Sequence, residues 1–162
     1  MSNASDPARQ LLRHTVATVA YRGGKTLRGA PASFASFANG ENARSPAKIV
    51  SHLSDLFDWA LSMARGENAW RNSESLPWDA EVARFFASLK AFDDFLATSQ
   101  PLHATPENLF QGPVADALTH VGQLAMLRRL AGCPMKSENY FKAEIAAGRV
   151  GAEQTPSQSE FD

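Results

Sequence analysis

The sequence predicts an all-α protein: a four-helix bundle followed by a short C-terminal helix. Four long segments carry apolar residues at helical spacing, and each is bounded by Pro, Gly or a capping residue. No segment alternates β-branched or aromatic residues with polar ones, so no strand is expected. Helices of similar length, each with one apolar face, bury those faces economically by packing against one another.

The first helix is expected to begin at the N-terminal stretch "SDPARQLL". Ser5 or Asp6 can cap it, because their side-chain oxygens accept hydrogen bonds from the free N–H groups of the first turn. Pro7 suits the first turn, where its missing N–H costs nothing. Gly23 and Gly24 are predicted to end this helix.

A loop rich in Gly, Ala, Ser and Pro is expected over residues 25–44. Its Phe34 and Phe37 predict that it lies over an apolar surface instead of hanging free. The second helix should then begin at Ser45, a cap followed by a proline, and run to Gly66. The loop could cover a pocket at one end of the bundle.

The third helix is expected between Pro77 and Pro101, and the fourth between the Gly112-Pro113 pair and Gly132. The third has the most regular apolar spacing of the set. Across the bundle, the residues predicted to be buried are Ile49, Leu53, Leu56, Phe85, Leu89, Leu127 and Leu130.

A shorter helix is predicted from Ser137 to Gly148, and it completes a single domain over residues 1–150. Residues 151–162 are polar and poor in apolar side chains, so they are expected to form a flexible tail.

Charge and composition narrow the classes of partner. The 162 residues include 16 Lys and Arg against 17 Asp and Glu, with no clustered basic stripe, so nucleic acid is not an expected partner. No apolar run approaches the ~20 residues of a membrane-spanning helix, and no signal-peptide pattern is present. The single cysteine, Cys133, cannot form an internal disulfide. A cytoplasmic protein without membrane contact is therefore expected.

Polar residues interrupt the apolar faces of two helices. On the second helix, His52 lies between Ile49 and Leu56 in an apolar stripe. On the fourth, the stretch "DALTHVGQL" places Asp116, His120 and Gln123 on one face. Buried polar groups need a partner, because an unpaired one costs about 1–3 kcal/mol.

Two interpretations of this polar cluster remain open. Asp116 and His120 lie four residues apart and are helical neighbours, so with His52 they could form the open set of two imidazoles and one carboxylate found in zinc hydrolases and non-haem iron enzymes. Gln123 could then support the ligands or a bound water. Alternatively, the cluster is a structural hydrogen-bonded group. His14 could also reach the interior, whereas His103 is expected in a solvated loop.

The element order and two motifs, "SHLSDLFDWAL" and "THVGQLAMLRRLAG", resemble the DinB/YfiT-like family of bacterial four-helix bundles over about residues 8–148. The resemblance implies a metal-binding histidine at His52 and another at His120, which is followed by the family's x-Gly-Gln and an aliphatic residue. Asp116 stands where the family usually has a third histidine. A carboxylate can replace an imidazole as a ligand and adds a negative charge that favours a divalent ion.

The resemblance also implies a range of functions. It suggests a divalent metal such as Zn, Ni, Fe or Mn, and either a metal-dependent hydrolase or a thiol-dependent transferase acting on a small molecule with a low-molecular-weight thiol. The alternative is a non-catalytic helical bundle that acts as a binding or interaction protein, with a homodimer formed through its exposed surface.

Overall fold

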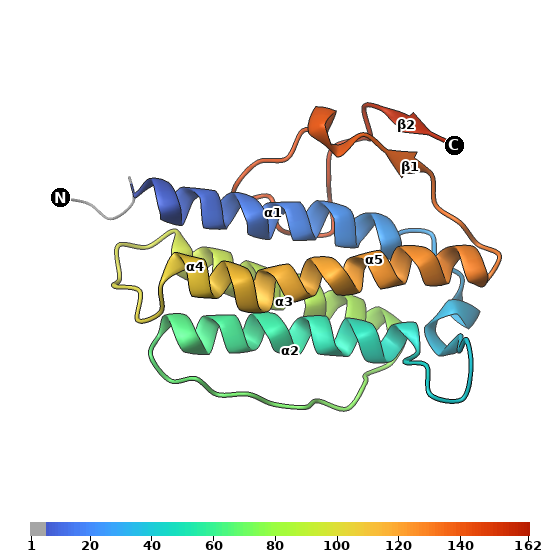
Figure 1. The fold of residues 1–162 in the computed structure, drawn as a ribbon, viewed down its shortest axis with the longest axis horizontal. Helices are drawn as coiled ribbons and strands as arrows, with labels where there is room; N and C mark the ends of the chain where they lie inside the picture. The colour runs from blue at the N-terminus through green and yellow to red at the C-terminus, as the bar shows by residue number, and fades with distance from the viewer. Residues whose placement is uncertain (1–5) are drawn as a thin grey trace.

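The computed structural model describes residues 6–162, in which four long helical segments lie side by side (Figure 1). They are α1 (Pro7–Leu27), α2 (Pro46–Ala64), α3 (Trp78–Leu96) and a segment made of α4 (Pro106–Leu109), a π turn (Phe110–Val114) and α5 (Ala115–Leu130). The only strands among these residues are the two-residue pair β1 (Ser137–Glu138) and β2 (Glu160–Phe161). The all-α prediction is confirmed, and the expectation of no strand is wrong only for this pair.

Side-chain caps start α1 and α2 where the sequence predicts them. Asp6 accepts a hydrogen bond from the Ala8 N–H at 3.0 Å, and Ser45 accepts one from the Lys48 N–H at 3.4 Å. In both helices a proline occupies the first turn. Ser5, the other candidate cap, lies outside the described residues.

The predicted end of the first helix is wrong, because α1 continues through Gly23 and Gly24 to Leu27. A β-carbon on Gly23 would lie 3.0 Å from Cζ of Phe85 and 3.5 Å from Cγ2 of Val121. Gly23 therefore permits a close approach of helices and does not stop the chain.

The predicted start of the fourth helix is also wrong. Thr105 caps it by accepting a hydrogen bond from the Asn108 N–H at 3.2 Å, and Pro106 occupies the first turn. Pro113, which was expected at the first turn, lies inside the π turn instead. The wider π geometry fits a residue that lacks a backbone donor. The predicted end at Gly132 holds, with φ +73° just beyond α5.

The core is apolar and lies between the four helical segments. The predicted core residues Ile49, Leu53, Leu56, Phe85 and Leu89 are buried. Leu127 is half-buried, and the prediction for Leu130 is wrong because its side chain is 52% exposed on the wall of a pocket. Phe34 is buried in a 3-10 turn (Ala32–Ser36), as expected for a loop that lies over the core.

The predicted helix over Ser137–Gly148 is wrong, since this segment contains only β1 and a 3-10 turn (Tyr140–Lys142). Its side chains turn toward α1 instead: buried Glu138 accepts hydrogen bonds from Lys25 at 2.8 Å and Tyr21 at 2.6 Å. The extended backbone of β1 therefore directs the Glu138 side chain toward α1.

The segment expected to be a flexible tail also makes defined contacts with α1. Its strand β2 pairs with β1, and the Glu160 Oε1 atom lies 2.9 Å from the Lys25 ammonium (Figure 1). These contacts place residues 151–162 against the domain. Of the helices within 6–162, none is long and apolar enough to cross a membrane.

Candidate metal centre

Three side chains from two helices converge at one point. His52 comes from α2, and Asp116 and His120 come from adjacent turns of α5. Each offers one ligand atom, and these atoms all lie within 4.8 Å of one another. The Asp116 Oδ2 atom is 3.3 Å from His52 Nε2, and its Oδ1 atom is 3.5 Å from His120 Nε2. The predicted convergence is confirmed.

The cluster lies where the core meets solvent. His120 is buried, His52 is 22% exposed and Asp116 is 46% exposed. The two imidazole rings lie edge to face with centroids 4.6 Å apart. The imidazoles thus approach from the core side, while the carboxylate closes the cluster from the solvent side.

Gln123 orients one of the two rings. Its Oε1 atom accepts a hydrogen bond from His120 Nδ1 at 2.8 Å. Because the Gln123 oxygen can only accept, Nδ1 carries a proton in this contact, and the neutral tautomer with this proton has its lone pair on Nε2, the atom that faces Asp116. Gln123 therefore lies where a residue that supports a metal ligand was expected.

The surroundings of His52 favour its neutral form. Burial lowers the pKa of His52 below its ordinary value, and the nearby His120 and Arg44 lower it further. The hydrogen bond to Asp116 opposes these effects without reversing them. A neutral imidazole keeps the lone pair that metal coordination requires.

The donor set fits a first-row divalent ion. Two imidazole nitrogens and one carboxylate oxygen suit Zn, Ni, Fe or Mn, with ligand distances near ~2.0–2.2 Å for zinc. Donor atoms that already lie within 4.8 Å of one another need only small side-chain rotations to reach one ion. Three protein ligands leave coordination positions open for water or a small molecule.

A pocket of about 590 Å³ adjoins the cluster. Its walls are the loop that ends at Arg44, the Ile49 and His52 side chains of α2, and the face of α5 from Asp116 to Leu130. This volume lies within the usual range for small-molecule sites, ~300–1,000 Å³. An open coordination position at the cluster would therefore face a cavity that can hold a small molecule.

A second wall, which sequence reasoning missed, comes from the loop over residues 65–77. Trp70 of this loop lies edge-on to the His52 ring, with centroids 5.6 Å apart, and equally close to Trp59. The Trp59 indole donates to Asn68 Oδ1 at 2.8 Å. Trp70 therefore packs against one side of the His52 ring, and Trp59 and Asn68 hold the loop beside it.

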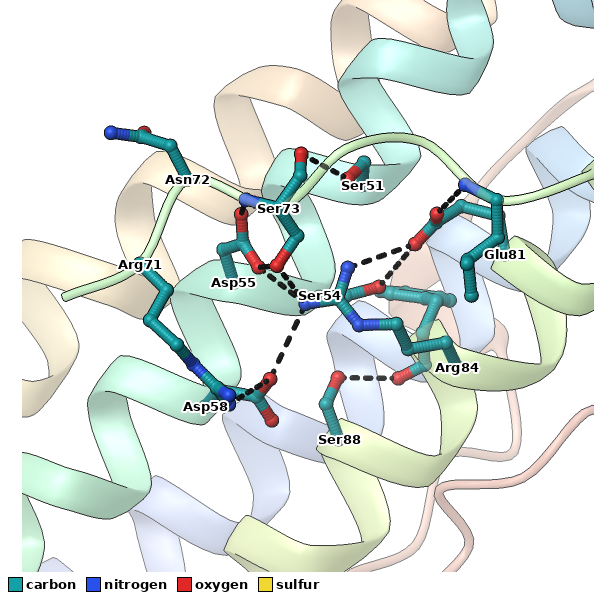
Figure 2. A network of polar contacts seen from close by, with 12 residues as sticks. Ser51, Ser54, Asp55, Asp58, Arg71, Asn72, Ser73, Glu81, Arg84 and Ser88 are labelled. Carbon is teal, nitrogen blue, oxygen red and sulfur yellow. Dashed lines mark hydrogen bonds and ion pairs between the residues drawn. The ribbon is translucent and has the colours of Figure 1, made fainter. Parts of the chain in front are cut away.

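Buried carboxylates fasten this loop to α2 and α3 (Figure 2). Asp55 accepts hydrogen bonds from the Ser73 backbone N–H at 2.8 Å and from the Ser73 hydroxyl at 2.7 Å, and it pairs with Arg84. Glu81 accepts from the Leu76 N–H at 2.8 Å. Burial raises the pKa of Asp55, but the Ser73 and Arg84 contacts outweigh burial and hold it below its ordinary value.

The remaining histidines do not join the cluster. His14 and His103 are both exposed, so the expectation that His14 could reach the interior is wrong. Cys133 is half-buried and packs against the core.

Comparisons with protein-family models, with curated proteins and with solved structures find no match to this chain. The geometry of the His52, Asp116 and His120 cluster is therefore the main indication of function.

Proposed function

We propose that this chain is a DinB/YfiT-like four-helix bundle that binds a divalent metal through His52, Asp116 and His120. The convergence of these three side chains, with Gln123 orienting one ring, is the observation that carries the proposal. The ligands lie on the second long helix and on the last one, as the family resemblance implies. We also infer a cytoplasmic protein, because one unpaired cysteine suits a reducing compartment.

The reaction class that fits this site is hydrolysis or thiol-dependent transfer of a small molecule. A divalent ion supplies Lewis acidity to a group placed in the pocket. His52 and His120 would each supply one imidazole nitrogen to that ion, and the Asp116 carboxylate would balance part of its charge. Trp70 packs against the His52 ring and helps to fix its position. The pocket beside α5 then receives the substrate.

Titration of metal-free protein tests the proposal. Zinc, nickel, manganese and ferrous iron are added separately while the heat and the thermal midpoint are followed, first for the wild type and then for two variants. His120→Ala removes a ligand, and His103→Ala removes an exposed histidine outside the cluster. We expect the wild type to bind one ion per chain with a Kd below about 1 mM, which corresponds to a binding free energy of more than ~4 kcal/mol. His103→Ala should bind the ion as the wild type does, and His120→Ala should not bind it.

The opposite result favours a different class of protein. If none of the four ions binds the wild type more tightly than millimolar, the cluster is structural, with Asp116 hydrogen-bonded to His52 and His120 hydrogen-bonded to Gln123. The chain would then be a non-catalytic helical protein that acts through binding or interaction.

A further inference from the structure

The pocket beside the candidate metal centre contains a cation without a partner. Arg44 lines this pocket and also a neighbouring one, and His52 lies at both. Within residues 6–162 the Arg44 side chain forms no hydrogen bond or ion pair. Three buried or half-buried arginines differ in this respect: Arg13 pairs with a carboxylate, Arg84 with several, and Arg128 donates to backbone carbonyls.

The charge of the pocket favours an anion. Asp116 is its one acidic residue among those described, and that carboxylate already faces both histidines. The positive charges of a divalent ion and of Arg44 together would exceed the single negative charge of Asp116. A guanidinium and a nearby metal ion are both suited to carboxylate oxygens, and the guanidinium can bind them through two parallel hydrogen bonds.

The far part of the same pocket is apolar. Beyond His120 and Gln123, the face of α5 continues with Leu127 and Leu130, and Met126 borders it. Leu130 is 52% exposed and Met126 is 63% exposed, so apolar surface is left uncovered inside a cavity. From His120 to Leu130 the helix rises ~15 Å, which sets the length that an apolar chain could follow.

We propose that the pocket binds a small carboxylate with an apolar chain, and this inference rests on the proposed metal-binding function. Arg44 binds the carboxylate, an ion held by His52, Asp116 and His120 would add to the attraction, and the chain extends along α5 toward Leu130. Arg44 is then the residue that selects the anionic group, while Leu127 and Leu130 select the apolar chain.

The test is calorimetric titration of octanoate, with acetate and octylammonium as reference ligands. Each ligand is added to zinc-treated and to metal-free wild type, and then to two variants. Arg44→Gln removes the pocket cation, whereas Arg71→Gln removes a 72% exposed arginine outside that pocket and serves as the matched control.

We expect zinc-treated wild type to bind octanoate more tightly than acetate, because acetate lacks the chain, and not to bind octylammonium. Loss of a charge-assisted hydrogen bond should weaken octanoate binding by Arg44→Gln about tenfold or more, and Arg71→Gln should leave it unchanged. Leu130→Ser should weaken octanoate binding without affecting acetate.

Two outcomes would overturn the inference: octanoate binding that is the same in Arg44→Gln as in the wild type, or octylammonium binding as tight as that of octanoate. Failure of the proposed function gives a different result. In that case zinc produces no binding heat, while the octanoate titration of metal-free protein still decides whether Arg44 recognises the anion.

Discussion

Replacing Asp55 by Asn should destabilise the protein by about 2–3 kcal/mol. The Asp55 side chain is 4% exposed, and it accepts two hydrogen bonds from Ser73 and one from Arg84. Removing one member of a buried charged pair costs ~3–5 kcal/mol. We expect a loss at or below the low end of this range, because Arg84 is 21% exposed and keeps its contacts with Asp58 and Glu81.

Urea unfolding followed by circular dichroism measures this loss as a change in the free energy of unfolding. Ser73→Ala should cost about 1 kcal/mol, because it removes the hydroxyl contacts with Asp55 and Arg84 but leaves the backbone N–H donor. Asp94→Asn is the matched control: its pair with Lys90 is exposed, so the change should stay within ~0.5 kcal/mol. An Asp55→Asn variant within 0.5 kcal/mol of the wild type would refute the anchoring role of Asp55.

Three further results are expected. Gly23→Leu should lower the free energy of unfolding in urea by ~2 kcal/mol or more, because the new side chain meets Phe85. Gly122→Ala should raise it by ~0.5–1 kcal/mol, because a β-carbon there has nothing within 4 Å. Burial raises the pKa of Glu138, but hydrogen bonds from α1 outweigh it and leave the pKa lowered. Its stabilisation is therefore full above its unfolded pKa of ~4.3 and lost as pH falls through the folded pKa, so acid should destabilise the wild type more steeply than Glu138→Gln. Asp116→His should keep zinc and nickel in calorimetric titration and lose manganese affinity at least about tenfold, because it removes the oxygen ligand and its charge.

The parts of the fold that the sequence predicts well are those in which local signals agree. For α2, the Ser45 cap and the apolar stripe identify the same start, and the structure confirms it. Prediction fails where distant contacts decide. Helix α1 extends past Gly23, where Phe85 packs closely against the glycine. Glu138 lies in extended backbone, in which its carboxylate reaches Tyr21 and Lys25 of α1. Neither contact leaves a periodic signal in the sequence.

The same distinction applies to the site. His52, Asp116 and His120 were predictable because each interrupts the apolar face of a helix, and helical spacing brings them onto facing sides. Trp70 and Arg44 were not, since both lie in loops whose positions depend on tertiary contacts. The loop that carries Trp70 is positioned by charged contacts to α2 and α3, and such pairings cannot be read from residue order alone.

The most direct test of the proposed metal centre is a crystal of the protein soaked with zinc, with diffraction recorded on both sides of the zinc absorption edge. We predict one anomalous peak per chain, with His52, Asp116 and His120 as ligands at ~2.0–2.2 Å and at least one further position held by water or a small molecule. A map without a peak at these three residues, or with zinc bound only at other surface carboxylates and histidines, would contradict it.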